Sequence, residues 1–155
     1  ICVVGGSEED SQIFNFQFFP LRGISRRETI FKHITHRPHS EMPYWLKAAD
    51  MLVLPNSGKY DISKYWTSPL KLFEYMASKR PIVASDLPSI REILNDKNSI
   101  LVEPDNPESL ANGINKALDD RVLGEIVARQ SFSDVEKYSW KTRAEKITNF
   151  INARH

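Results

Sequence analysis

A short stretch beginning at Ser68 combines residue types that could bind an anion. Ser68 and Pro69 predict a helix start, with Ser68 as the N-cap and Pro69 at the first helical position. The backbone amides of Leu70 and Lys71 would then lack helical partners, because the first four amides of a helix have none. Such a start attracts phosphate groups. Lys71 would oppose the helix dipole at a cost of about 0.3–1 kcal/mol, which a bound diphosphate would reverse, so the stretch predicts a diphosphate ligand.

Lys71, Glu74 and Ser78 would share one face of this helix, because they lie three and seven residues apart. Two interpretations of that face stay open from the residues alone. Lys71 and Glu74 could pair with each other on a solvated surface, or both could contact a ligand.

Other groups that could do chemistry are weaker candidates. His33, His36 and His39 recur at intervals of three, but zinc sites usually add cysteine or acidic ligands, so we expect no metal there. Asp86 precedes a predicted helix and is interpreted as its N-cap rather than as a catalytic acid.

The composition is that of an ordinary globular chain. Of the 155 residues, 41% are hydrophobic and 26% are charged, and this length predicts one domain with its own core. A net charge of +1 argues against broad electrostatic capture of nucleic acid. A local group of basic residues is interpreted as a solvated face. It consists of Arg22, Arg26, Arg27, Lys32 and Arg37.

Cysteine use and apolar runs indicate where such a chain would work. Cys2 is the only cysteine, so no internal disulfide can form and a reducing compartment fits best. No apolar run approaches the roughly 18 residues of a membrane-spanning helix, and no signal peptide is visible. The chain opens on ICVVGG without a Met, which predicts a start inside a larger protein, at or just before a core strand.

Apolar runs and helical periodicity alternate along the chain, and they define the elements that would position these residues. The expected buried strands are Ile1–Val4, Thr29–Ile34, Met51–Pro55, Pro81–Ser85 and Ser99–Glu103. A first helix is expected to start at Ser7–Asp10. The next helices are expected at Glu41–Ala49, with Ser40 as N-cap, at Pro69–Ser78 and at Pro88–Leu94. Two more are expected, one beginning at Asn106 and a last one over Trp140–Ile151.

Three of these helices have an expected core face. In the Glu41–Ala49 helix it is formed by Tyr44, Leu46 and Ala48. In the helix that begins at Asn106 it is formed by Leu110, Ile114, Ala117 and Leu118, and in the Trp140–Ile151 helix by Trp140, Ala144, Ile147 and Ile151.

Continuous apolar strands that alternate with helices predict an α/β fold, with a Rossmann-like parallel sheet covered by helices on both faces. Ligands of such sheets bind beyond the carboxyl ends of the strands. The functional residues are therefore expected in five segments: Gly5-Gly6, His36–His39, Asn56–Trp66, Ser68–Glu74 and Ser85–Leu87.

The stretch SPLKLFEYMASKRPIVASDLPSIREIL resembles the signature segment of GT-B glycosyltransferases, specifically the large retaining family 4, group 1. It shows a helix with an acid, small residues, a basic residue before Pro, an apolar strand, and Asp before the next helix. YWLKAADMLVLPNS, LVEPDNPESLANGINKAL and YSWKTRAEKITNFI resemble the family's flanking segments. The resemblance spans Ile30 to Ile151, and more loosely ICVVGGSEED.

The resemblance implies that residues 1–155 are the nucleotide-sugar-binding domain, the C-terminal half of a GT-B fold. Glu74 matches the second acid of the family's Glu-x7-Glu motif, which binds the ribose hydroxyls. The amides of Leu70 and Lys71 match those that hold the diphosphate, and Arg37 lies in the segment beside the base. The implied donor-binding set is Glu74, Lys71, Leu70, Ser68, Trp66, Arg37, Gly5 and Gly6.

One position departs from the family pattern. The first acid of the motif would fall at position 66, which is Trp66 in this sequence. That acid contacts the donor sugar or its leaving phosphate, so its role is vacant or reassigned. Trp66 could stack on a sugar face, or it could pack against its own loop.

The function that the resemblance implies is transfer of a sugar from a nucleoside-diphosphate sugar, without a metal cofactor, in glycan biosynthesis. The acceptor-binding N-terminal domain, the first strand of this half and a basic pair that steadies the phosphates would lie upstream of Ile1, so the chain alone would transfer no sugar. The resemblance implies a cytoplasmic location, and it allows peripheral association of the full enzyme with the inner face of a membrane. Two alternatives stay open: a non-catalytic nucleotide- or phosphate-binding α/β module, and a sugar-nucleotide epimerase of GT-B fold.

Overall fold

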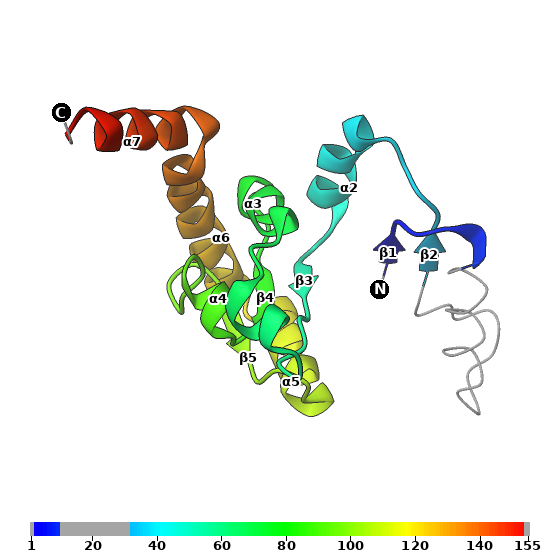
Figure 1. Ribbon diagram of the computed structural model, residues 1–155. Coiled ribbons are helices and arrows are strands. Elements are labelled where there is room, and N and C mark those ends of the chain that lie inside the picture. The colour runs from blue at the N-terminus through cyan, green and yellow to red at the C-terminus, as the bar shows by residue number, and fades with distance from the viewer. Residues whose placement is uncertain (1, 10–31, 154–155) are drawn as a thin grey trace, which may run out of the picture. The chain divides into compact units, whose positions relative to one another are not determined.

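The structure is a computed structural model that describes residues 2–9 and 32–153 (Figure 1). It consists of two compact units, Ile1–Met42 and Pro43–His155. Four predictions lie wholly or partly outside the described residues. They are the basic group at Arg22, Arg26 and Arg27, the first residue of the strand at Ile1–Val4, the first half of the strand at Thr29–Ile34, and the helix after Ser7, of which Glu8 and Glu9 are helical.

The first unit contains two short parallel strands. β1 (Cys2–Val4) pairs with β2 (Lys32–Ile34), with Cys2 opposite Lys32 and Val4 opposite Ile34. The prediction that the first strand is buried is wrong, since Cys2 is exposed and Val3 is 40% exposed. An apolar run predicts a strand, but it does not show that both faces of that strand are covered.

The second unit contains a three-stranded parallel sheet in the order β3-β4-β5. β3 (Leu52–Leu54), β4 (Ile82–Ser85) and β5 (Ile100–Val102) each lie within a predicted apolar run. Leu52 lies opposite Ile82, and Val83 lies opposite Ile100. The predicted α/β class with parallel strands is confirmed. Among the described residues, β1 pairs with β2 in the first unit, and β3, β4 and β5 pair in the second.

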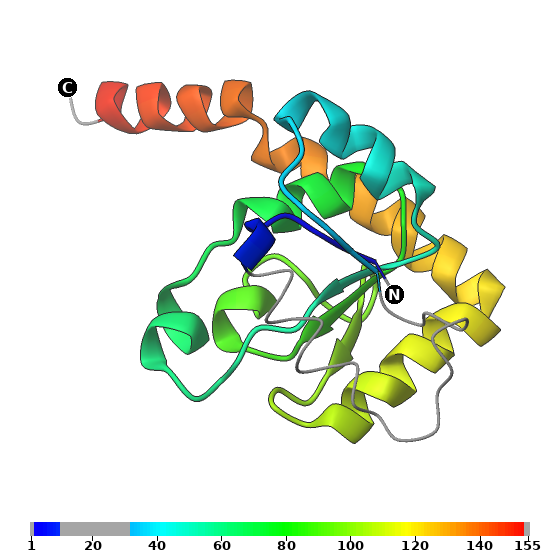
Figure 2. The same ribbon diagram turned by 90° about the vertical axis from the view of Figure 1, so that its right-hand side faces the viewer.

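Helices occupy most of the remaining second unit (Figures 1 and 2). The α-helices are α2 (Met42–Ala48), α3 (Leu70–Ala77), α4 (Pro88–Arg91), α5 (Pro107–Asp119), α6 (Arg121–Val135) and α7 (Trp140–Asn152). Shorter turns are the 3-10 turns η1 (His39–Glu41) and η3 (Glu136–Tyr138) and the π-helical turn η2 (Ile62–Trp66).

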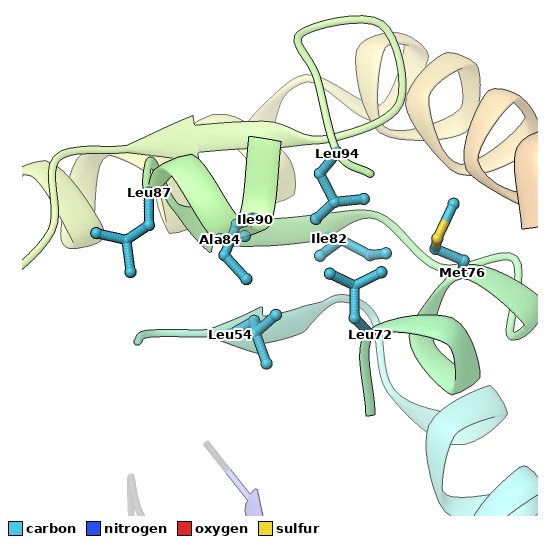
Figure 3. Packing of buried hydrophobic residues seen from close by; sticks show 8 residues of the cluster. All are labelled: Leu54, Leu72, Met76, Ile82, Ala84, Leu87, Ile90 and Leu94. Atoms are coloured by element: carbon cyan, nitrogen blue, oxygen red, sulfur yellow. The ribbon is translucent and has the colours of Figure 1, made fainter. Parts of the chain in front are cut away.

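The core of the second unit lies on both faces of the β3-β4-β5 sheet. One cluster joins β3 and β4 to α3 and α4, and Figure 3 shows its side chains gathered between these elements. It consists of Leu54, Leu72, Met76, Ile82, Ala84, Leu87, Ile90 and Leu94. A second cluster joins Val83, Ile100 and Val102 to Ala117 of α5. Since neighbouring residues of β4 point to opposite clusters, the prediction of helices on both faces is confirmed for this sheet.

Helix α6 was not predicted. Its buried residues are Gly124, Val127, Ala128 and Ser131, so most of its buried face consists of small side chains that give almost no apolar periodicity. Its start does carry a sequence signal, because the Asp120 side chain accepts a hydrogen bond from the Leu123 amide. The predicted start of α5 at Asn106 is confirmed, and the structure shows Asn106 as its N-cap, with the side chain accepting a hydrogen bond from the Ser109 amide.

The N-cap and the core face predicted for helix α2 are wrong in part. Ser40 does not cap α2, since it lies inside the 3-10 turn η1, which extends the helical backbone upstream of Met42. Tyr44 is 78% exposed and Ala48 is exposed, whereas Leu46 is half-buried. These three residues recur at intervals of two, which is not the period of a helix, so they do not lie on one face of α2.

The apolar faces predicted for α5 and α7 also differ from the structure. Leu118 of α5 is 54% exposed, while Ala117 beside it is buried. In α7, Trp140 is 76% and Ile147 and Ile151 are each 53% exposed, so the predicted face exists but is uncovered. Among the described residues, no helix is both long and apolar enough to cross a membrane.

Candidate functional site

The start of α3 is the feature of the second unit best suited to bind an anion. Helix α3 begins at Leu70, and Pro69 is its N-cap residue, with φ −67° and ψ 123° and no side-chain cap. The prediction that Ser68 caps the helix with Pro69 as first helical residue is therefore wrong. The extended backbone of Pro69 moves the helix start one residue along, so Ser68 lies one position too early to reach the amides.

This shift leaves amides available at the helix start. The Leu72 amide donates to the Pro69 carbonyl at 3.0 Å. Within the described part of the chain, the amides of Leu70 and Lys71 have no acceptor. Leu70 is 74% exposed and Lys71 is exposed, so both amides and the ammonium group are accessible at the positive end of the helix dipole.

Buried residues of α3 fix which side of the helix faces outward. Leu72 and Met76 are fully buried in the core, which leaves Lys71 exposed and Glu74 half-buried one turn along the helix. Burial raises the pKa of the Tyr75 hydroxyl, and the charge of the neighbouring Glu74 raises it further. Glu74 itself lies one turn from the helix start, and its side-chain oxygens can accept hydrogen bonds from hydroxyl groups.

Trp66 lies at the end of η2, in the connection between β3 and α3. The expected loop over Asn56–Trp66 contains this π-helical turn, which was not predicted. Trp66 is 80% exposed, so the interpretation that it packs against its own loop is wrong. An exposed indole ring can stack on the apolar face of a sugar, and that interpretation stays a prediction.

Backbone contacts bring together the predicted site residues of the first unit. The Gly5 amide donates to the Ile34 carbonyl at 2.9 Å, and the His36 amide donates to the Gly6 carbonyl at 3.0 Å. Gly5 and Gly6 have φ values of +119° and +84°, in the region that favours glycine. Arg37 follows His36 and is exposed. The glycine turn after β1 and the Arg37 segment after β2 therefore lie side by side.

The predicted histidine group is not a metal centre in the described residues. His33 Nε2 lies 2.7 Å from the carbonyl oxygen of Gly5, which it can reach as a hydrogen-bond donor. Across residues 2–9 and 32–153, no group of three or more His, Cys, Asp or Glu side chains could hold a metal ion.

Asp86 is neither a helix cap nor an unpaired acid. The N-cap of α4 is Leu87, and no side chain caps it. Asp86 instead pairs with Arg91, whose Nε lies 2.5 Å from Oδ1 and whose Nη2 lies 2.7 Å from Oδ2. The hydrogen bonds from Arg91 lower the pKa of Asp86, so it stays ionised and cannot donate a proton near neutral pH.

Two residues that the sequence did not single out hold the connection between β3 and α3. The Gly58 amide donates to Asp105 Oδ2 at 2.8 Å, and Ser89 Oγ donates to the Ser63 carbonyl at 2.9 Å. The Pro-Asp-Asn-Pro run around Asp105 indicates a turn. It could not reveal a partner 47 residues earlier in the chain.

Taken together, the second unit is a Rossmann-like α/β layer whose helix start offers amides and a lysine to an anion. The chain belongs to the glycosyltransferases of group 1, since the family profile described as "Glycosyl transferases group 1" matches residues 1–120. The resemblance noted from the sequence is thereby confirmed.

Individual relatives agree with this assignment. An uncharacterized glycosyltransferase of Methanocaldococcus jannaschii is 34% identical over 105 residues, which are 66% of this chain and 25% of that protein. The chain spans about a quarter to a third of the length of the first curated relatives it matches.

Two solved structures show the fold at different extents. A mutant of Staphylococcus aureus TarM, in complex with fondaparinux, α-GlcNAc-glycerol and UDP, is 26% identical with a TM-score of 0.70, covering 97% of this chain and 28% of TarM. The C-terminal domain of a group 1 glycosyl transferase, LpcC, from Francisella tularensis has 16% identity and a TM-score of 0.54. That match covers 90% of this chain and 85% of the LpcC domain.

Proposed function

We propose that the chain is the donor-binding part of a retaining glycosyltransferase, and that it binds a nucleoside-diphosphate sugar at the start of α3. The observation that carries the proposal is the helix start itself. The Leu70 and Lys71 amides have no acceptor among the described residues, no side chain caps them, and the Lys71 ammonium lies at the same end. Helix amides and a cation would stabilise the diphosphate as it leaves the sugar.

The remaining predicted residues have complementary roles in this proposal. Glu74 would accept hydrogen bonds from the two ribose hydroxyls, and Trp66 would stack on the sugar. That Arg37, Gly5 and Gly6 of the first unit contact the nucleotide stays a prediction from the family resemblance. Ser68 would contact the diphosphate without capping the helix. Support for a uridine nucleotide comes from TarM, which is 26% identical and whose structure holds UDP.

The acceptor and the chemistry of transfer belong to the whole enzyme. We propose that the acceptor-binding N-terminal domain lies elsewhere in the same protein, and that the present chain binds a donor without transferring its sugar, because transfer needs both substrates in reacting geometry. The sugar would be transferred with retention of configuration and without a metal ion. A cytoplasmic location, with peripheral membrane association of the full enzyme, stays a prediction.

Calorimetric titration of the chain with UDP, GDP and ADP tests the proposal. We expect saturable binding of at least one of the three, tighter than binding of the corresponding nucleoside. Lack of binding by all three would contradict it. The epimerase alternative makes a different prediction, since an epimerase would change the configuration of the sugar on its nucleotide without any acceptor.

A further inference from the structure

The connection between β3 and α3, residues 55–69, exposes its large apolar side chains to solvent. Tyr60 is 67%, Ile62 is 71% and Trp66 is 80% exposed. Ordering this backbone costs conformational entropy, and burial of these side chains offsets little of that cost. Polar contacts with the rest of the unit must therefore supply much of the order.

The first such contact is made by Asp105, in the turn between β5 and α5. Its Oδ2 accepts a hydrogen bond from the Gly58 amide at 2.8 Å. A hydrogen bond from Ser57 is the main reason that the pKa of Asp105 is lowered, and the Gly58 amide and the charge of Lys59 lower it further. Asp105 has φ +57°, a left-handed conformation that is uncommon outside glycine, so its turn is shaped to present this carboxylate.

The second contact is made by Ser89, in α4. Ser89 is 6% exposed, and its Oγ donates to the Ser63 carbonyl at 2.9 Å. Ser63 lies in η2, three residues before Trp66. Thr67 Oγ1 donates back to the Ile62 carbonyl at 2.7 Å and closes this turn just before α3. The two ends of the turn are thus fixed, one by the buried Ser89 and one by Thr67.

We propose that Ser89 and Asp105 are positioning residues of the donor site, which hold the β3–α3 connection so that Trp66 and the start of α3 are ordered before the ligand arrives. The identity of the ligand rests on the function proposed above, whereas the ordering of the connection does not. Preorganisation of this kind strengthens binding because less entropy is lost when the ligand binds.

The chain offers a direct reporter of this order. It has three tryptophans, so Trp45→Phe with Trp140→Phe leaves Trp66 as the only one. The fluorescence anisotropy of Trp66 then reports how freely the connection moves without ligand. Its change on titration with UDP reports binding at the same place.

Ser89→Ala and Asp105→Ala are compared in this single-tryptophan chain. Each should lower the anisotropy of Trp66 without ligand and weaken UDP binding by roughly three- to tenfold, as expected for one lost hydrogen bond. Asp105→Asn, which keeps an acceptor oxygen, should reduce the Trp66 anisotropy and the affinity for UDP less than Asp105→Ala does. Matched controls are Ser131→Ala, a buried serine whose Oγ has no partner among the described residues, and the exposed Asp119→Ala. Both control variants should leave the Trp66 anisotropy and the affinity for UDP unchanged.

The outcomes separate this proposal from the proposed function. If Ser89→Ala and Asp105→Ala leave the Trp66 anisotropy at the value of the controls, the positioning role is wrong. If the single-tryptophan chain shows lower anisotropy in both variants but none of UDP, GDP or ADP binds, the connection is held as proposed and the donor-binding function is wrong. Asp105 lies at the surface, so its variants keep the test decisive if Ser89→Ala unfolds.

Discussion

Arg91 holds the carboxylate of Asp86 with two of its nitrogens, and its third nitrogen lies 3.1 Å from Asp96 Oδ2. The two ends of the short helix α4 are thereby tied together on the surface of the molecule. The pair replaces the N-cap that the sequence predicted for Asp86, and it keeps this acid ionised beside the carboxyl end of β4.

The Asp86–Arg91 pair predicts the direction of the pH dependence of stability. The pKa of Asp86 is lowered from 3.8 by the hydrogen bonds of Arg91, and that of Asp134 is lowered chiefly by Lys137. A carboxylate whose pKa is lower in the folded state contributes stability above its unfolded pKa, and this contribution is lost as the pH falls through the folded pKa. We expect the free energy of unfolding in urea to be lower at pH 3 than at pH 7.

Arg91→Ala measures how much the Asp86–Arg91 pair contributes to this pH dependence of stability. Because both side chains are more than a third exposed, solvent screens the pair and the loss of stability at pH 7 should be small. The difference in unfolding free energy between pH 7 and pH 3 should also shrink. An identical pH dependence in both proteins would show that the pair contributes nothing.

Gly113 predicts a large effect from a small substitution. A Cβ at this position of α5 would lie 2.4 Å from Val102 Cγ1 and 3.1 Å from Val83 Cγ1, both in the core. Gly113→Ala should therefore destabilise the fold by about 1–3 kcal/mol, although helix propensity alone would favour Ala by about 1 kcal/mol. Asn115→Ala, at an exposed position of the same helix, is the control and should not lower the melting temperature. A melting temperature for Gly113→Ala equal to that of the control would mean that α5 does not approach the sheet this closely.

The strands and the parallel class could be predicted because burial on both sides leaves continuous apolar runs such as those at Met51–Pro55 and Pro81–Ser85. The start of α5 at Asn106 could be predicted because this residue is followed by Pro and an acid. The prediction of Ser68 as N-cap was wrong because a small polar residue before Pro does not indicate whether the proline is helical or extended. Helix α6 was missed because most of its buried residues are small.

Only those residues of the candidate site that belong to a continuous sequence motif could be predicted. Lys71 and Glu74 follow from local spacing and from the family resemblance. Ser89 and Asp105 contact the β3–α3 connection from 26 and 47 residues away, and no local pattern encodes such a pairing.

Glu74→Ala should weaken nucleoside-diphosphate binding and leave the fold intact. Loss of a charged acceptor of two hydroxyl hydrogen bonds should cost roughly 1.5–3 kcal/mol, which is about a 10- to 150-fold increase in Kd. Titration calorimetry with UDP measures the change, and circular dichroism checks the fold. Glu145→Ala, an exposed acid of α7, is the matched control. An unchanged Kd for Glu74→Ala would remove Glu74 from the site.

Binding of UDP should not depend on a divalent metal. The sequence has no Asp-x-Asp cluster near a strand end, which is the arrangement that would hold Mg²⁺ beside a diphosphate. We expect the same Kd, within a factor of about two, in EDTA and in MgCl₂, because helix amides and Lys71 take the place of the metal. Loss of binding in EDTA would place the diphosphate at a site other than the start of α3.

The most direct test of the donor site is the chemical shift of the Leu70 and Lys71 amides in the isotope-labelled chain during titration with UDP and, separately, with uridine. The account predicts that both signals move saturably with UDP and little with uridine, because the phosphates bind those amides. The Arg121 and Val122 amides, at the start of a helix that Asp120 caps, should stay in place. Saturable binding of UDP that leaves Leu70 and Lys71 unmoved, or no saturable shift anywhere in the chain, would contradict the central claim.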